Sequence, residues 1–247
     1  METLTCRLLP WDTADGPTNM AADEVLVRTA AERGIASLRF YGWQPATLSL
    51  GYFQPAAARL ADPRLSALPF VRRPSGGAAL VHDREVTYAL AVPAGAVWQA
   101  GGPWMQRMHQ IILSGLSSLG LTAVQVAEVK NPECVGRVLC FQQFTPADLL
   151  CGGHKIVGSA QRKHCRALLQ HGAILLRCSQ HTPVLPGLYE LTGRRWTADE
   201  IRHAVVAAFS AVTGWTLEPA DWSAEEQTLA VKLAAEKYNS SEWNEKR

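Results

Sequence analysis

Apolar residues follow strand spacing in the middle of the chain and helical spacing nearer its ends. The run E-V-T-Y-A-L-A-V is typical of a strand that stops at Pro93. Between Trp104 and Leu119, apolar positions recur at i, i+3 and i+4, which predicts a helix with one apolar face. Turn residues separate the remaining apolar runs. We predict strands at residues 37–42, 46–53, 69–73, 85–92, 121–126, 148–151, 155–160 and 167–176.

Capping signals predict three more helices. Thr18 or Asn19 is positioned to cap a helix that runs to Arg33, after which a glycine stops it. A T-x-x-E box at 197–200 and an S-x-x-E box at 223–226 each precede an apolar helical run. We expect the two helices that follow these boxes to pack as a pair.

Two segments lack a steady period. Residues 129–147 contain prolines and a glycine and are predicted to form a long loop, and the tail from Tyr238 onward is polar. Strands dominate the middle of the chain and helices its flanks, so the predicted fold class is α+β, with a mixed β-sheet flanked by helices.

Composition excludes several classes of protein. At 47% apolar residues, the 247-residue chain can bury a substantial core, so disorder over most of it is not expected. Its net charge is only +2, which argues against a binder of nucleic acids or membrane surfaces. No apolar run approaches the ~18 residues that a membrane span needs. The first residues lack the features of a secretory signal, so we expect a cytoplasmic, reducing location.

Five of the six cysteines crowd into one stretch, at positions 134, 140, 151, 165 and 178. A metal site, a disulfide framework, a reactive thiol or no function at all would each be compatible with such crowding. No C-x₂-C pair occurs, and the C-x₂-H pair of Cys151 and His154 is followed directly by Lys155, a poor neighbour for a cation. We expect neither a metal nor a disulfide here.

The segment R-R-P-S-G-G-A (72–78) joins two arginines to a Gly-Gly turn, and His82 follows in the same substructure. Glycine lets backbone N–H groups approach a carbonyl or phosphate oxygen, and arginine adds a planar cationic fork. The alternative is a plain β-turn with two surface arginines. The P-loop pattern is absent.

Two further residues are candidates for chemistry. Lys155 lies between a Gly-Gly turn and an apolar strand that ends in G-S-A, a position from which a lysine can point into a concave site. Cys140 lies in a predicted loop and would be a nucleophile if a nearby cation lowered its pKa. The alternatives are an exposed hairpin lysine and a buried, inert cysteine.

Taken together, the ordered motifs resemble the lipoate/octanoate protein-transferase and ligase family, which shares the catalytic fold of biotin protein ligases. The resemblance rests on N-M-A-A-D-E (19–24), F-Y-G-W-Q-P-A-T-L-S-L-G-Y-F-Q (40–54), R-R-P-S-G-G-A-A-L-V-H-D-R-E-V-T-Y (72–88), G-H-K-I-V-G-S-A-Q (153–161), Q-H-G-A-I-L-L (170–176) and the ending E-K-Y-N-S-S-E-W-N (236–244). It implies one catalytic domain over residues 1–247, including the helical segment 197–240.

The resemblance also implies a tunnel for a medium acyl chain and an acceptor lysine on a lipoyl carrier domain, with no cofactor and no metal. Lys155 matches the family's essential lysine, and Cys140 and Lys155 are the implied catalytic residues. The implied substrate-binding residues are Arg72, Arg73, Ser75, Gly76, Gly77, Ala78, His82, Gly158, Ser159, Ala160, His171 and Gly172.

Within that family, C-F-Q-Q-F-T-P-A-D-L (140–149) resembles the nucleophile motif C-F-x-x-P-S-x-[Y/N]-[E/D]-L of a cysteine-dependent octanoyltransferase branch. Phe144 and Thr145 replace the Pro-Ser of that motif, and Ala78 replaces a third glycine. The implied reaction moves an octanoyl group from acyl carrier protein to a lipoyl domain, such as glycine cleavage H protein or a 2-oxoacid dehydrogenase E2. The alternatives are an ATP-dependent lipoate or octanoate ligase, a lipoyl-domain amidotransferase and a non-catalytic binding module.

Overall fold

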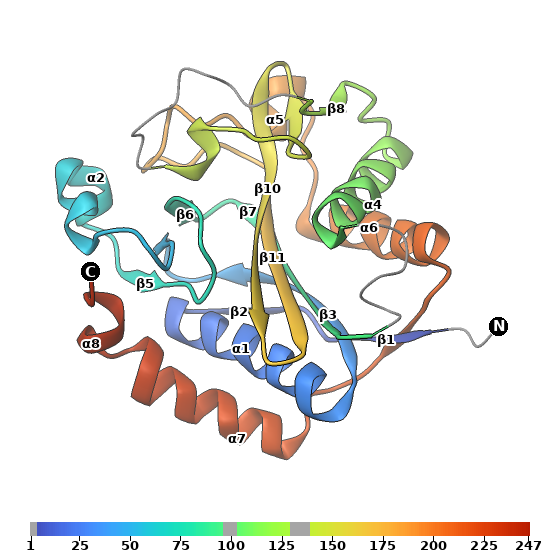
Figure 1. Cartoon of the computed structure of the whole chain (residues 1–247). Coiled ribbons are helices and arrows are strands. Elements are labelled where there is room, and N and C mark those ends of the chain that lie inside the picture. The colour runs from blue at the N-terminus through green and yellow to red at the C-terminus, as the bar shows by residue number, and fades with distance from the viewer. Residues whose placement is uncertain (1–3, 96–102, 129–138) are drawn as a thin grey trace.

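The computed structural model describes residues 4–95, 103–128 and 139–247. A twisted mixed sheet runs through the molecule, with helices on both faces (Figure 1). The N-terminal strands and the last strand pair in parallel. The other strand pairs of this sheet are antiparallel. In spatial order the strands are β12 (Thr216–Pro219), β1 (Thr5–Leu8), β3 (Ala36–Trp43), β7 (Glu85–Pro93), β11 (Ala167–Leu175), β10 (His154–His164), β9 (Leu149–Cys151) and β8 (Val124–Val126), and β2 (Asp12–Ala14) pairs with β3.

A second, smaller sheet carries the segment around the Gly-Gly turn. Its order is β5 (Phe70–Arg72), β4 (Thr47–Leu50) and β6 (Leu80–His82). Strand β4 is shorter than predicted because the chain turns at Gly51, where Gln54 N–H donates to the Gly51 carbonyl. Both sheets confirm the predicted α+β class with a mixed sheet flanked by helices.

Alternation along β7 separates two apolar layers. Val86, Tyr88, Leu90 and Val92 face the layer that contains α4 (Trp104–Ser118) and α6 (Ala198–Thr213). Ala89 and Ala91 face the opposite layer, which contains α1 (Gly16–Arg33). The short helices η1 (Ala56–Ala61), α2 (Pro63–Ser66) and α5 (Leu188–Thr192) lie in the connections.

The C-terminal helices do not form a pair, so that prediction is wrong. Helix α6 packs on α4, whereas α7 (Ala224–Leu233) packs on α1 across the sheet. Both predicted capping boxes are present. The polar tail is also structured: it continues as the π-helical turn η4 (Ala234–Tyr238) and helix α8 (Ser241–Asn244), and it buries Tyr238 against Glu24.

Helix α1 begins earlier than predicted. Asp15 caps it by accepting from Thr18 N–H, and a proline occupies its first turn. Asn19 is buried and instead donates to the Ala14 and Gly42 carbonyls. Part of the predicted loop 129–147, residues 129–138, lies outside the described residues, and the remainder holds only the short helix η3 (Cys140–Gln142). No helix among the described residues has the length and apolarity to cross a membrane.

Candidate active site

Cys140 and Lys155 lie side by side. Cys140 opens η3, and its N–H donates to the Ala79 carbonyl at 2.7 Å, which fixes this turn against the Gly-Gly segment. Lys155 follows the turn between β9 and β10 and points back, so that its Nζ lies 3.6 Å from Cys140 Sγ. The lysine amine therefore faces the sulfur directly.

Asp148 holds the other side of the lysine. Its Oδ2 lies 2.9 Å from Lys155 Nζ, and both side chains are almost fully buried. Asp148 also accepts a hydrogen bond from Thr145 N–H, which fixes the carboxylate. Burial alone would lower the pKa of Lys155, but the negative charges of Cys140 and Asp148 raise it above its usual value. The lysine is therefore held as an ammonium.

Cys140 borders a cavity with about 460 Å³ of empty space, including its open mouth. A cavity of this size, bounded mainly by aliphatic and aromatic side chains, suits a small apolar ligand with one reactive end. Its lining residues are Met20, Tyr41, Trp43, Ser49, Arg73, Gly77, Ala78, Leu80, His82, Thr87, Cys140, Phe141, Gly158, Ser159, Ala160, His171, Gly172 and Ala173.

Arg73 shapes the loop that forms one wall. Its guanidinium is buried and donates to the carbonyls of Ser49, Gly76 and Ala78, each at 3.0 Å. Burial lowers the pKa of Arg73 from its usual value. The arginine thus fixes the Gly76–Ala78 turn from inside and adds a second buried cation to the cavity wall.

Two buried histidines brace the same walls. His171 connects Ser75 to Asp23, with Nε2 2.5 Å from Ser75 Oγ and Nδ1 2.7 Å from Asp23 Oδ2. His82 stacks on Trp43 at 3.8 Å between ring centroids, and its Nδ1 lies 2.7 Å from Glu85 Oε1. Burial lowers the pKa of His82, although Glu85 acts in the opposite direction. Both rings line the cavity, and these contacts fix their orientation in its wall.

Most of the predicted site residues meet at this cavity. Lys155 contacts Cys140, Ser75 reaches the wall through His171, and nine residues line it directly: Arg73, Gly77, Ala78, His82, Gly158, Ser159, Ala160, His171 and Gly172. Gly76 lies in the turn but not among the lining residues.

Arg72 is placed differently from the prediction. Its side chain is fully buried, and its guanidinium donates to the carbonyls of Gly51, Tyr52, Gln54 and Asn244. Neighbouring residues of a strand point to opposite faces, so only Arg73 of the pair can face the cavity. Arg72 instead ties α8 to the turn after β4.

Sequence reasoning missed several side chains that hold the site. Asp148 could have been identified from the sequence, because it occupies a fixed position in the Cys140 motif. Asp23 and Ser49 become important only through buried contacts that no local pattern reveals. His109 bonds to Ser159 from α4, in a stretch whose helical spacing offered no signal for chemistry.

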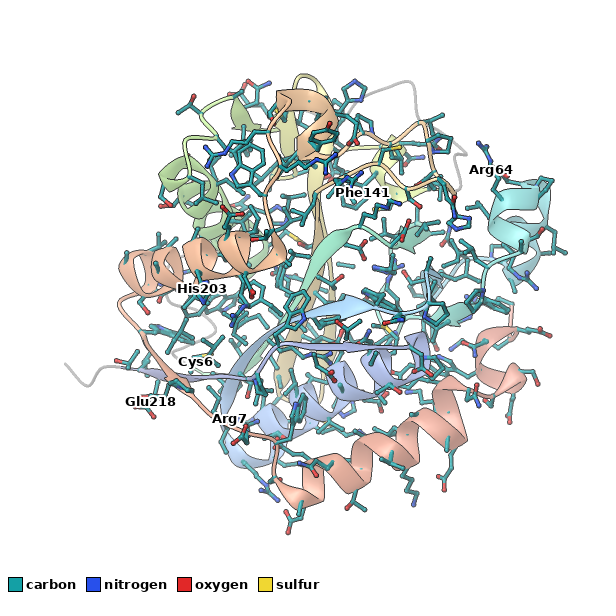
Figure 2. The ribbon with its side chains drawn as sticks, turned by 180° about the vertical axis from the view of Figure 1, so that it is seen from behind. Cys6, Arg7, Arg64, Phe141, His203 and Glu218 are labelled. Carbon is teal, nitrogen blue, oxygen red and sulfur yellow. The ribbon has the colours of Figure 1, made fainter. Side chains whose placement is uncertain are left out.

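The other cysteines differ in their surroundings. Cys6 and Cys151 are buried as expected for packing residues, and burial raises the pKa of Cys6 to about 12. Figure 2 places Cys6 near β1, far from Phe141, the residue next to Cys140. Cys165 is exposed in the turn between β10 and β11, and Cys134 lies outside the described residues. The described residues contain no cluster of three metal-ligating side chains.

Comparisons with known proteins agree with this geometry. Residues 15–184 match the family model of the lipoyl protein ligase A/B catalytic domain. The chain belongs to this family. The matched stretch includes Cys140, Asp148 and Lys155, and α6, α7 and α8 lie beyond it.

Relatives within the lipoyl protein ligase A/B family align with this chain over all or nearly all of its length. The chain is 34% identical to octanoyltransferase LipM of Bacillus subtilis (strain 168), with 100% of both chains covered. It is also 34% identical to octanoyltransferase LipM of Geobacillus kaustophilus (strain HTA426), with 93% of this chain and 94% of that protein covered. The solved structure of Ta0514, a putative lipoate protein ligase from T. acidophilum, has the same fold, with a TM-score of 0.80, 23% identity and coverage of 99% and 100%.

Proposed function

We propose that this chain transfers an octanoyl group through a thioester on Cys140. Its full-length similarity to octanoyltransferases makes it an octanoyltransferase of protein lipoylation, an acyltransferase that needs an acyl donor and a lipoyl-domain acceptor. The observation that carries the thioester proposal is the 3.6 Å contact between Lys155 Nζ and Cys140 Sγ at the edge of the cavity. The donor in this proposal is octanoyl-acyl carrier protein.

In the first half-reaction, the Cys140 thiolate attacks the carbonyl carbon of the donor thioester. A new C–S bond forms, the bond to the carrier's thiol breaks, and the octanoyl chain occupies the apolar cavity. A thioester has enough free energy to form an amide, so ATP has no role. Arg73 holds the Gly76 carbonyl, and the N–H of a trans peptide points opposite to its C=O. Gly77 N–H is therefore directed away from Arg73, and we assign it to the oxyanion.

In the second half-reaction, a lysine amine of the lipoyl domain attacks the Cys140 thioester. The C–N bond forms, the C–S bond breaks, and the thiolate returns to its place beside Lys155. The acceptor is a lipoyl domain such as that of glycine cleavage H protein or a 2-oxoacid dehydrogenase E2.

The test is the intact mass of the enzyme after mixing with octanoyl-acyl carrier protein. We expect one octanoyl group per chain, labile to hydroxylamine, and none on Cys140→Ser. Cys165→Ser is the matched control, because that thiol is exposed and is not among the residues that line the cavity, and it should acylate normally. An adduct on Cys140→Ser would contradict the proposal. Activity only with free octanoate and ATP would favour the ligase alternative, and octanoyl accepted only from another lipoyl domain would favour an amidotransferase.

A further inference from the structure

His109 is a buried histidine that touches the cavity wall from behind. It lies on α4 and is only 1% exposed, and both of its ring nitrogens form hydrogen bonds. Nδ1 lies 2.6 Å from the Ala147 carbonyl oxygen, and Nε2 lies 2.6 Å from Ser159 Oγ. Ser159 in turn lines the acyl cavity.

The direction of these hydrogen bonds follows from their partners. A carbonyl oxygen can only accept, so His109 Nδ1 carries a proton and donates to Ala147. Burial lowers the pKa of His109, so the ring is neutral near pH 7 and its Nε2 is an acceptor. The Ser159 hydroxyl must therefore donate to His109. Tyr88 OH, 2.6 Å from Ser159 Oγ, then donates to Ser159 and itself accepts from Gln170.

This arrangement leaves Ser159 Oγ with one lone pair beyond its bonds to His109 and Tyr88. A hydroxyl oriented in this way accepts an N–H and cannot donate to an oxyanion. Gly172 leaves the space that this hydroxyl occupies, because a Cβ at Gly172 would lie 2.2 Å from Ser159 Oγ. Ser159 also directly follows Gly158, the residue over which the Lys155 side chain passes.

His109 also reaches the other side of this wall. It lines a surface groove together with the exposed residues Gln106, Gln110 and Glu128. The imidazole thus lies between the acyl cavity, which it reaches through Ser159, and a groove that opens to solvent.

Lys155 is poorly suited to take the second proton of the reaction. Asp148 lies 2.9 Å from its Nζ, and its carboxylate is among the charges that raise the pKa of Lys155, which holds the lysine as an ammonium. An amine that attacks the thioester must nevertheless lose a proton to become an amide. A neutral acceptor close to Cys140 is needed.

We propose that Ser159 and His109 form the proton relay for the acceptor amine in the second half-reaction. As the C–N bond forms, the amine N–H passes its proton to Ser159 Oγ, and the Ser159 hydroxyl proton moves to His109 Nε2. The C–S bond breaks, and the electron pair leaves on Cys140 Sγ, facing Lys155. After the octanoylated lipoyl domain leaves, the imidazolium returns its Nε2 proton through Ser159 Oγ to water in the cavity, which restores the starting tautomer with Nδ1–H donated to Ala147. This inference rests on the proposed acyl-enzyme and names the groups that complete its turnover.

Charges from several elements act on the His109 ring. Asp148 favours the imidazolium, and Lys155 and burial oppose it. Tyr88 faces Ser159 from β7, and Glu128 lies on the groove side. The pH at which the relay titrates therefore depends on Asp148 and Lys155 as well as on His109.

His109→Gln separates the relay from its structural role. A glutamine amide can donate to Ala147 and accept from Ser159, but it cannot take a proton near pH 7. We expect acylation of Cys140 to stay close to the wild-type rate, while transfer from acyl-enzyme to lipoyl domain slows by roughly 100-fold. The inflection that His109 adds to the transfer pH profile should disappear, which leaves only the inflection of the acceptor amine. Ser159→Ala should slow transfer similarly, and the double variant should be no slower than either single variant.

His203→Gln is the matched control, because His203 is an exposed histidine on α6 far from Phe141 in Figure 2. Both of its half-reactions should match wild type. Equal slowing of acylation and transfer in His109→Gln, or an unchanged transfer rate, would overturn the relay. Failure of the wild-type enzyme to form an acyl adduct would instead overturn the proposed function. If His109→Gln does not fold, the ratio of the transfer rate to the acylation rate in Ser159→Ala decides the question: a ratio equal to that of wild type would overturn the relay.

Discussion

The side chain of Lys155 crosses Gly158 so closely that any side chain at position 158 would displace it. A Cβ at position 158 would lie 2.1 Å from Lys155 Cε and 2.6 Å from Nζ. The atoms that would have to move are the flexible end of a lysine, so the backbone need not yield. The absence of a side chain at Gly158 thus lets the ammonium of Lys155 occupy its position beside Cys140.

Gly158→Ala should displace Lys155 from Cys140 while the fold persists. We expect acylation by octanoyl-acyl carrier protein to slow by about 10- to 100-fold, since a misplacement near 1 Å costs about this much. The free energy of unfolding should change little. The control is a double-mutant cycle: in a Lys155→Ala background the clash is gone, and Gly158→Ala should have no further effect on acylation. Additive losses would show that Gly158 acts by another route.

Asp148→Asn should change the pH range over which Cys140 reacts. The carboxylate raises the pKa of Lys155, so its removal lowers that pKa. Since the proposed acylation uses Lys155 as a cation beside Cys140, the decline of acylation at high pH should begin at a lower pH than in wild type. At neutral pH we expect a loss of roughly 10-fold in acylation. An alkaline limb that stays at the same pH would contradict this role for Asp148.

Arg72 should matter for stability more than for turnover. Its loss leaves several buried carbonyls without a donor, so Arg72→Met should lower the free energy of unfolding by roughly 3 kcal/mol. Chemical denaturation and the acylation rate per folded molecule are the two measurements. Arg64→Met is the control, because the ion pair of Arg64 with Asp62 lies at the surface, where solvent screens it and its contribution to stability is small. If Arg72→Met stays as stable as wild type but loses acylation, the guanidinium acts on substrate after all.

Acid should weaken the contact between α7 and the sheet. Burial alone would raise the pKa of Glu226, but hydrogen bonds from Arg7, Ser223 N–H and Thr29 lower it from 4.5 to about 2. A carboxylate with a depressed folded-state pKa stabilises the protein above its unfolded pKa, and this contribution is lost as pH falls.

The free energy of unfolding should therefore decline between about pH 4.5 and pH 2, the interval between the ordinary and lowered pKa of Glu226. Glu226→Gln should be less stable than wild type at pH 7, and the difference should shrink across that interval. Urea denaturation at a series of pH values measures both. A difference that stays constant with pH would contradict the assignment.

The local sequence pattern determined most of the secondary structure. The alternation of 85–92 and the helical spacing of 104–119 depend on which residues face a core, and β7 and α4 appear where these patterns predict them. The capping boxes begin α6 and α7 because they act within a single turn. The placement of α6 and α7 on opposite faces depended on partners distant in sequence, and no local pattern carries that information.

The sequence by itself singled out Cys140 and Lys155, because a motif records residues that must occur at a set spacing. Only the tertiary structure decided which groups surround them. It turned Arg72 away from the cavity and Arg73 toward it, placed Asp148 against the ammonium, and brought His109 from α4 to Ser159 on β10. Burial makes such groups interact strongly by excluding water, and burial is a property of the packed chain that no segment possesses alone.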